Sequence, residues 1–222
     1  MEIGSSEWQG FIIESARKLG IELDETVTAP FSAHASELLT WNRKINLTAI
    51  TNPRDIAIKH FLDSLAPVGF IPHGARLLDI GSGAGFPGIP LKILKPSISA
   101  LLIDGVRKKI NFVKHVLRIL GFENIEARQI RTENLLKEPE YATSFDVIIS
   151  RALSDLSPFV KSALPLLAKQ GTIIAMKGKV DGKELDAVRA DVPGDQYSLK
   201  IEKYGLPSIN GLRSLVIIKQ LH

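Results

Sequence analysis

The chain has 222 residues, of which 45% are hydrophobic and 23% are charged, a composition typical of a globular protein with one ample core. It contains no cysteine, which excludes disulfides, thiolate metal ligands and cysteine nucleophiles, and its five histidines show no paired ligand spacing, so we expect no metal. The net charge is +4, but residues 1–25 hold six acids and two bases, which leaves 26 − 18 = +8 for the remainder and favours a polyanionic partner.

The chain begins with a region that is predicted to be helical. We expect three amphipathic helices before the first strand, over residues 6–19, from residue 24 or 28 to residue 41, and over residues 53–65. The first residues carry acids and no basic region ahead of an apolar stretch, so we expect neither a signal peptide nor a transit peptide. No apolar run approaches the roughly 20 residues that span a membrane. These features predict a cytoplasmic protein without a membrane contact.

Two polar segments of this helical region are candidates for contact with a partner. Residues 41–48 combine an aromatic ring with Asn, Arg and Lys side chains, which are the groups that contact phosphates and stack on bases. The segment is either an RNA-facing edge or a capped helix end with Trp41 in the core. In the third helix, His60, Asp63 and Ser64 fall on one face, but nothing in the sequence shows that this face meets a substrate.

Residues 77–88 show the pattern of a buried strand, a glycine loop and the start of a helix. The loop carries four glycines within eight residues, and such a turn between a parallel strand and a helix is where doubly wound sheets bind adenosine-containing cofactors. The G-x-G-x-x-G pattern from Gly83 to Gly88 fits a dinucleotide such as NAD, although it is a weak signal alone. The longer D-x-G-x-G-x-G pattern from Asp79 to Gly85 resembles the S-adenosylmethionine site of Rossmann-like methyltransferases.

After this loop, strands and helices alternate, as a parallel sheet requires. We expect strands at residues 100–104, 125–130, 145–150 and 172–176, and helices at residues 108–120, 157–169 and 182–192. Two final strands at residues 197–204 and 212–219 leave no room for a crossover helix, so they should form an antiparallel hairpin.

These elements together predict an α/β fold. It is similar to the Rossmann-like S-adenosylmethionine-dependent methyltransferase fold, with a seven-stranded, mostly parallel sheet that ends in an antiparallel hairpin. We expect residues 1–70 to form an N-terminal helical extension packed on the core, and residues 71–222 to form the core.

Polar residues at the ends of the predicted strands are the candidates for chemistry. Asp104 ends the second strand, about 21 residues after Gly83, where an acid accepts hydrogen bonds from ribose hydroxyls in Rossmann-like sites. Thr132 and Glu133 follow the third strand, where they either meet the adenine edge or form a plain helix cap made by Thr132. Arg151 follows the fourth strand, and its planar fork of donors suits a carboxylate, a phosphate or guanine O6, or else a structural ion pair.

Several motifs together resemble one family over nearly the whole chain. They are W-N-x-x-x-N-L-T at residues 41–48, H-x-L-D-S-L at residues 60–65, L-D-I-G-S-G-A-G-F-P-G-I-P-L at residues 78–91, S-R-A at residues 150–152 and K-G at residue 177. The chain thereby resembles the glucose-inhibited division protein B family. Members are S-adenosylmethionine-dependent methyltransferases that place a methyl group on N-7 of a guanine in bacterial 16S ribosomal RNA.

The resemblance and the strand positions together give a set of expected site residues. The expected cofactor contacts are Gly81, Ser82, Gly83, Phe86, Asp104, Thr132, Glu133 and Arg151, of which Arg151 is also the candidate catalytic residue. The expected RNA contacts are Asn42, His60, Lys177 and Arg213. The family more often has a small residue before the glutamate where this chain has Thr132.

The family reaction needs no general base, because guanine N-7 carries a lone pair and no proton. We therefore expect in-line methyl transfer from S-adenosylmethionine, accelerated chiefly by positioning. The expected partner is 16S ribosomal RNA or the small ribosomal subunit, and the protein is expected to be a monomer. Two alternatives remain open on the sequence: an NAD-dependent dehydrogenase and a non-enzymatic RNA-binding module.

Overall fold

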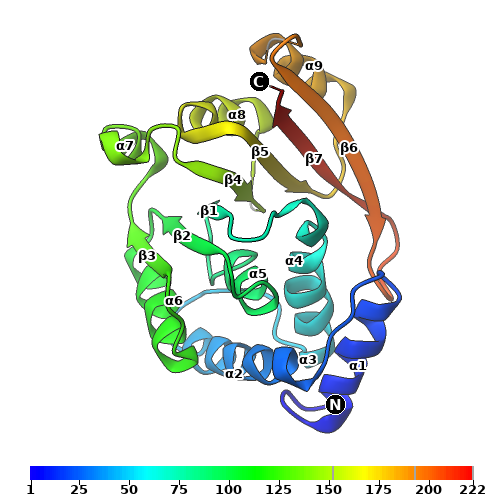
Figure 1. Cartoon of the computed structure of the whole chain (residues 1–222). Coiled ribbons are helices and arrows are strands. Elements are labelled where there is room, and N and C mark those ends of the chain that lie inside the picture. The colour runs from blue at the N-terminus through cyan, green and yellow to red at the C-terminus, as the bar shows by residue number, and fades with distance from the viewer. Residues whose placement is uncertain (152, 193, 222) are drawn as a thin grey trace.

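A seven-stranded sheet forms the centre of the computed structural model, which describes residues 1–151, 153–192 and 194–221 (Figure 1). The strands are β1 (Arg76–Ile80), β2 (Ser99–Asp104), β3 (Ile125–Gln129), β4 (Phe145–Ser150), β5 (Leu167–Lys177), β6 (Tyr197–Gly205) and β7 (Leu212–Gln220). Their order is β3-β2-β1-β4-β5-β7-β6, with β1 to β5 parallel and β7 antiparallel to both β5 and β6. The predicted sheet and its terminal hairpin are confirmed. Ala152, the last residue of the predicted S-R-A motif, lies outside the described residues.

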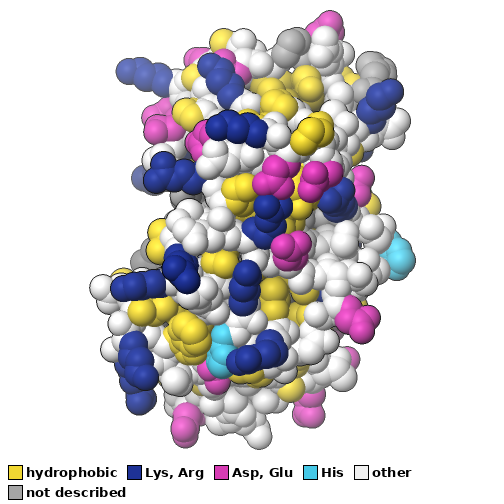
Figure 2. Space-filling model, turned by 90° about the vertical axis from the view of Figure 1, so that its left-hand side faces the viewer, with side chains coloured by type: hydrophobic (Ala, Val, Ile, Leu, Met, Phe, Trp, Pro, Cys, Tyr) yellow, Lys and Arg dark blue, Asp and Glu magenta, His cyan; other side chains and the backbone are white. Residues whose placement is uncertain are grey.

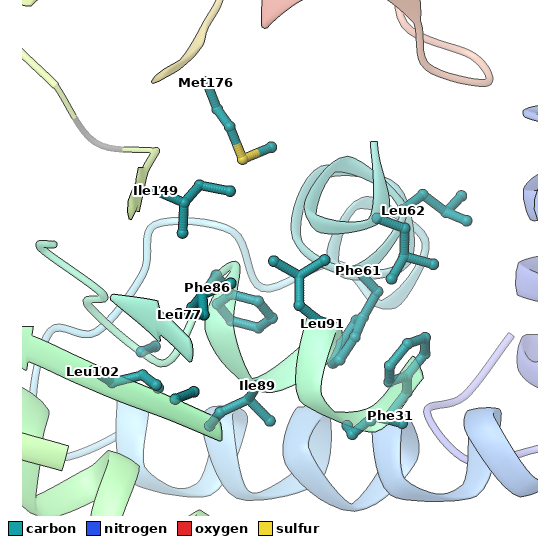
Figure 3. Close-up of a cluster of buried hydrophobic side chains, with 14 of the residues drawn as sticks. Phe31, Phe61, Leu62, Leu77, Phe86, Ile89, Leu91, Leu102, Ile149 and Met176 are labelled. Atoms are coloured by element: carbon teal, nitrogen blue, oxygen red, sulfur yellow. The ribbon is translucent and has the colours of Figure 1, made fainter. Parts of the chain in front are cut away.

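Helices cover both faces of this sheet. They are α1 (Ser6–Arg17), α2 (Glu25–Asn42), α3 (Pro53–Ile56), α4 (Asp63–Leu65), α5 (Gly88–Leu94), α6 (Arg107–Leu120), α7 (Thr132–Leu135), α8 (Leu156–Ala163) and α9 (Gly182–Asp191). Neighbouring residues of each strand point to opposite faces, so Leu77 and Leu102 belong to the buried cluster that includes residues of α1, α2, α5 and α6, whereas Leu78 and Leu101 belong to the one that includes residues of α8 and α9. Figure 3 shows the first of these clusters, in which strand side chains meet the rings of Phe31, Phe61 and Phe86 from the helices and the glycine loop.

The N-terminal helices begin where side chains can satisfy their free N–H groups. Asp24 accepts hydrogen bonds from the second and third residues of α2, and Asn52 does the same for α3, where Pro53 occupies the first helical position. The helix predicted over residues 53–65 forms in three parts, because a π-helical turn over Ala57–Leu62 separates α3 from α4. Such wide turns occur frequently at functional sites.

Long-range hydrogen bonds connect these helices to the rest of the molecule. The indole of Trp8 donates to the Pro53 carbonyl at 2.9 Å, and the Arg54 guanidinium donates to the Ser208 hydroxyl at 3.0 Å. Ser208 lies in the turn of the β6–β7 hairpin, which Figure 1 shows reaching down to the N-terminal helices. The hairpin therefore contacts the helical region as well as the sheet.

One predicted helix was wrong in extent. The sequence predicted a helix over residues 157–169, but α8 ends at Ala163 and β5 begins at Leu167. Pro165 has no N–H to donate to a continuing helix, and Leu167 pairs with Phe145 in the sheet. The apolar run that favoured a longer helix is the buried start of a strand.

Candidate cofactor and substrate site

The glycine loop between β1 and α5 forms a tight turn at the carboxyl end of the sheet. Gly81, Gly83 and Gly85 have φ values of +72°, +59° and +86°, a region that residues with a side chain rarely adopt. At Gly88, an added Cβ would lie 2.8 Å from the Asp79 carboxylate and 3.0 Å from the Leu102 side chain. The glycines therefore let the loop turn sharply and let α5 pack closely on β1 and β2.

A cleft of 380 Å³ opens beside this loop, at the carboxyl ends of β1, β2 and β3. Four of the predicted cofactor contacts line it: Gly81, Asp104, Thr132 and Glu133. Isoleucines at the ends of the three strands supply an apolar wall. Thr132 is the first residue of α7 rather than its cap, and the preceding residue makes no side-chain capping bond, so the predicted helix cap by Thr132 is not formed.

Asp104 lies at the base of the cleft and holds the loop in place. One carboxylate oxygen accepts the N–H of Gly83 at 3.2 Å, and the other accepts the N–H of Val106 at 2.8 Å. Lys109 lies 3.6 Å from the same carboxylate. A carboxylate has about four acceptor positions, so Asp104 retains capacity for donors from a ligand in the cleft.

A second cluster lies on the other side of the glycine loop, around Arg151 at the end of β4. Its guanidinium donates to the Lys59 carbonyl at 2.9 Å and to Nδ1 of His60 at 3.2 Å. The guanidinium carbon lies 5.1 Å from the centre of the Phe86 ring, and Nη1 lies 3.5 Å from the Asp63 carboxylate. Two consecutive residues of the π-helical turn thus bind the Arg151 guanidinium, Lys59 through its carbonyl and His60 through its ring.

Asp63 joins this cluster to the terminal hairpin. Its side chain is fully buried; it accepts a hydrogen bond from the Tyr204 hydroxyl at 2.8 Å and forms an ion pair with Nε of Arg213 at 3.0 Å. Burial and the nearby Asp63 raise the pKa of Tyr204, so its hydroxyl keeps the proton that it donates. Groups from α4, β4, β6 and β7 therefore meet at one carboxylate.

His60 is held as a neutral ring of one tautomer. Its Nδ1 accepts from Arg151, so the proton sits on Nε2, which donates to the Thr48 hydroxyl at 3.0 Å. Phe86 lies between two histidine rings, stacked on His60 and on His34 with centres 4.6 Å apart in each case. Burial, together with the Arg151 charge, lowers the pKa of His60 to about 3 and that of His34 to about 4.

Two of the other predicted site residues, Asn42 and Lys177, have partners within the protein. The Asn42 side chain accepts the N–H groups of Leu47 and Thr48 and donates to the Thr48 carbonyl, so it fixes the loop over residues 43–48. Lys177 at the end of β5 forms an ion pair with Glu184. Ser82 is buried, and its hydroxyl has no hydrogen-bond partner in the part of the chain that the structure describes.

Sequence reasoning missed several members of the site. The sequence did indicate that Asp63 could belong to the site, because it lies on the same helical face as His60. Thr48 also carried a signal, because it ends the motif at residues 41–48, whereas His34 and Tyr204 carried none, because their roles depend on contacts with residues 50 and 141 positions away.

Asp79, beneath the glycine loop, should make stability depend on pH. One of its oxygens accepts the Gly88 N–H at 2.8 Å, and burial raises its pKa from 3.8 to about 7, opposed in part by this hydrogen bond. Between pH 3.8 and about pH 7 the folded protein keeps a proton on Asp79 that the unfolded chain releases. The contribution of Asp79 to the free energy of unfolding is therefore full below pH 3.8 and falls as the pH rises to about 7. Asp79→Asn stays neutral and keeps an acceptor for Gly88.

We therefore expect the stability of Asp79→Asn, relative to the native chain, to rise by about 1.4 kcal/mol per pH unit from about pH 4 to 7 and then to level off. Urea unfolding of both proteins at several pH values measures this difference. A constant difference across the range would contradict a raised pKa.

The part of the chain that the structure describes has neither a metal-binding cluster nor a membrane-spanning helix. Over residues 1–151, 153–192 and 194–221, no three or more His, Asp or Glu side chains are grouped so that they could hold a metal ion. No helix in the described parts of the chain has both the length and the hydropathy needed to cross a membrane.

Comparison with known proteins places the chain in a family. Residues 28–207 match the GidB family, described as rRNA small subunit methyltransferase G. The chain is 45% identical over 206 residues to Ribosomal RNA small subunit methyltransferase G of Geobacter sulfurreducens, covering 92% of this chain and 94% of the relative. It is 42% identical over 214 residues to the protein of the same name from Geobacter metallireducens, covering 96% of each.

Among solved structures, the chain is similar in fold to M. jannaschii TYW2 in complex with AdoMet, with a TM-score of 0.56, 12% identity and coverage of 71% of this chain and 73% of that one. At 12% identity this similarity concerns the fold alone. The family match and the relatives at 42–45% identity cover most of the sequence and therefore show the family. The chain therefore belongs to the GidB family of rRNA small subunit methyltransferase G proteins.

Proposed function

We propose that this protein transfers a methyl group from S-adenosylmethionine to N-7 of a guanine in bacterial 16S ribosomal RNA. The observation that carries the proposal is the position of the glycine loop between two different sites: the cleft beside Asp104 on one side and the Arg151 cluster on the other. Membership of the GidB family supports this proposal and argues against the alternative that the protein is an NAD-dependent dehydrogenase.

The residues of the cleft fit an adenosine-containing cofactor. The acceptor capacity left on Asp104 suits two ribose hydroxyls, and the apolar wall formed by Ile80, Ile103 and Ile130 suits the adenine ring. Thr132 and Glu133, which line the same cleft, would hold the adenine edge. When bound, S-adenosylmethionine supplies an electrophilic methyl group on its sulfonium.

The Arg151 cluster suits a purine that needs no proton removed. An N–H of the Arg151 guanidinium that is not used by the Lys59 carbonyl or His60 can donate to guanine O6 alone, which leaves the lone pair of N-7 free to attack. His60 is unsuited to act as a base, because its Nδ1 already accepts from Arg151 and its pKa is lowered to about 3. Positioning is then the main source of rate, which can contribute about 7–11 kcal/mol in favourable systems.

The N-terminal region has a defined part in this proposal. Residues 1–70 act as an extension of the methyltransferase core that supplies His60 and Asp63 to the substrate side of the site. We take the protein to act as a monomer in the cytoplasm, where bacterial ribosomal RNA is found.

The test is a methyl-transfer assay on small ribosomal subunits, and on 16S RNA alone, from cells that lack this protein. With labelled S-adenosylmethionine, we expect one methyl group per RNA, located at a guanine N-7 by borohydride reduction followed by aniline-induced strand cleavage. Binding of the RNA without transfer would favour the non-enzymatic RNA-binding module. Methylation at any other atom would overturn the proposed reaction.

Asp104→Asn should weaken cofactor binding. The amide keeps one oxygen for the backbone N–H groups but loses the charge that would strengthen the ribose hydrogen bonds, each of which contributes about 1.5–3 kcal/mol. We expect the affinity for S-adenosylmethionine, measured by isothermal titration calorimetry, to fall about 10–150-fold. Asp146→Asn is a matched control, because Asp146 also accepts a backbone N–H, at 2.7 Å from Arg76, but at the opposite end of the sheet. Equal affinities for the two variants would remove Asp104 from the site.

A further inference from the structure

A shallow depression of 410 Å³ lies outside the site described above, between the end of α2 and the middle of α6. It is lined by Trp41, Asn111, Lys114, His115 and Arg118. The four α6 residues follow one another at intervals of three, one and three, so they form one face of the helix. Figure 2, which views this side of the molecule, shows a histidine beside hydrophobic and basic side chains at the height of α6 and α2.

Trp41 forms an aromatic platform in this depression. It is partly exposed, and its ring lies 5.7 Å from the Phe112 ring and 5.0 Å from the His115 ring. These contacts hold the indole in place from one side. A fixed, partly exposed indole is the kind of surface on which an unpaired base stacks.

The surroundings of Trp41 carry a positive charge. Lys114 and Arg118 are exposed on α6, and Arg43 and Lys44 are exposed directly after α2. Glu37 of α2 accepts from Nε2 of His115 at 2.7 Å, while Nδ1 of His115 accepts from Arg118 at 3.2 Å. Four cations, Arg43, Lys44, Lys114 and Arg118, therefore lie around Trp41, and Glu37 is paired with His115.

The depression is linked to the Arg151 cluster by the loop that follows Trp41. Asn42 fixes this loop, and the Thr48 hydroxyl at its end accepts from His60. A row of rings also leads inward, from Trp41 to Phe112, then to His34 at 5.9 Å and to Phe86 at 4.6 Å. The loop over residues 43–48, which begins with the exposed Arg43 and Lys44, therefore runs from Trp41 to the His60 side chain of the Arg151 cluster.

We propose that this depression is a second RNA-contacting surface, which holds an unpaired segment of the substrate RNA that flanks the target guanine. One base stacks on Trp41, and the phosphates beside it pair with Lys114 and Arg118. This inference rests on the proposed function, since it takes RNA to be the substrate. An RNA segment fits the surface because aromatic and cationic groups alternate on it, which is how single strands are bound with little sequence preference.

The main test removes the two α6 cations in Lys114→Ala/Arg118→Ala. Its matched control is Arg17→Ala/Lys18→Ala, which removes the same two residue types from exposed positions at the end of α1. Binding of 16S RNA is measured from low to physiological salt, and methyl transfer is measured with unmethylated small subunits.

For the α6 variant we expect KM to rise at least about tenfold with kcat within about twofold of the native value, and the slope of log affinity against log salt to fall by about two. The control variant should match the native protein in all three quantities.

The second test concerns the aromatic platform. Trp41→Phe keeps a ring for stacking, whereas Trp41→Leu removes it, so RNA affinity should fall about 5–150-fold in the leucine variant and much less in the phenylalanine variant. Thermal unfolding shows whether both variants are folded, and if the leucine variant is not, the α6 variant decides the matter.

The outcomes separate this inference from the proposed function. If the native protein transfers no methyl group, the proposed function fails. If the native protein transfers the methyl group and the α6 variant has the same KM and salt slope as its control, the second RNA surface is overturned while the proposed function stands.

Discussion

Replacement of Asp63 by alanine should lower the free energy of unfolding by about 3–5 kcal/mol, because it leaves buried cations without a counter-charge. The Asp63 side chain has no exposed surface, and those of Arg151 and Arg213 are only 17% and 31% exposed. The Tyr204 hydroxyl would lose its acceptor in the same change. Chemical denaturation of the purified variant measures the loss.

Two further variants separate charge from shape. Asp63→Asn keeps the size of the side chain and an acceptor oxygen, so it should recover part of the lost stability. Asp55→Ala removes an acid from the same helical region that pairs with Lys59 and is 44% exposed, and it should cost less than about 1 kcal/mol. If Asp63→Ala cost no more than Asp55→Ala, the cluster would not be a determinant of stability.

Arg151→Lys should reduce the rate of methyl transfer at least about 100-fold while leaving the protein folded. Lysine keeps the positive charge beside Asp63, but a single ammonium cannot donate to the Lys59 carbonyl and to His60 in the fixed geometry of the guanidinium fork. A misplacement of about 1 Å in a positioning group is enough to cause a loss of this size. Single-turnover rates at saturating cofactor and RNA measure the effect.

The same variant also distinguishes the two roles proposed for Arg151. A weaker affinity for S-adenosylmethionine in calorimetry would assign it to the cofactor, whereas an unchanged affinity with a slower transfer step would assign it to the guanine. Arg128→Lys is the matched control, because Arg128 also forms a forked pair, with Glu138, but outside the Arg151 cluster. Transfer rates that fall equally in both variants would argue against a specific role for Arg151.

The sequence predicted the sheet because its signals are local. Buried strands with residues such as Leu77 and Leu78 on alternate faces, a glycine loop at residues 81–88 and two final strands joined by a short turn each depend on a few neighbouring residues. The end of α8 was mispredicted for the opposite reason. The run after Ala163 is apolar in either state, and only the pairing of Leu167 with Phe145 decides that it is a strand.

The residues of the candidate site also fall into those that the sequence places correctly and those whose role only the structure decides. The cleft residues Gly81 and Asp104 lie at the ends of predicted strands, and parallel strands bring their carboxyl ends to one edge, so the sequence alone determines that they are close. For Asn42, the sequence left an RNA-facing edge and a capped helix end equally open, and the structure directs its side chain to the backbone of the following loop.

Only the tertiary structure decided that Asp63 meets Arg151 and Tyr204, or that Phe86 lies between His34 and His60. A polar residue in a helix has the same local signal whether it faces water or a buried arginine. What distinguishes the two cases is desolvation and a charge partner, and for Asp63 both come from distant segments of the chain, such as those of Arg151 and Arg213, that only folding brings together.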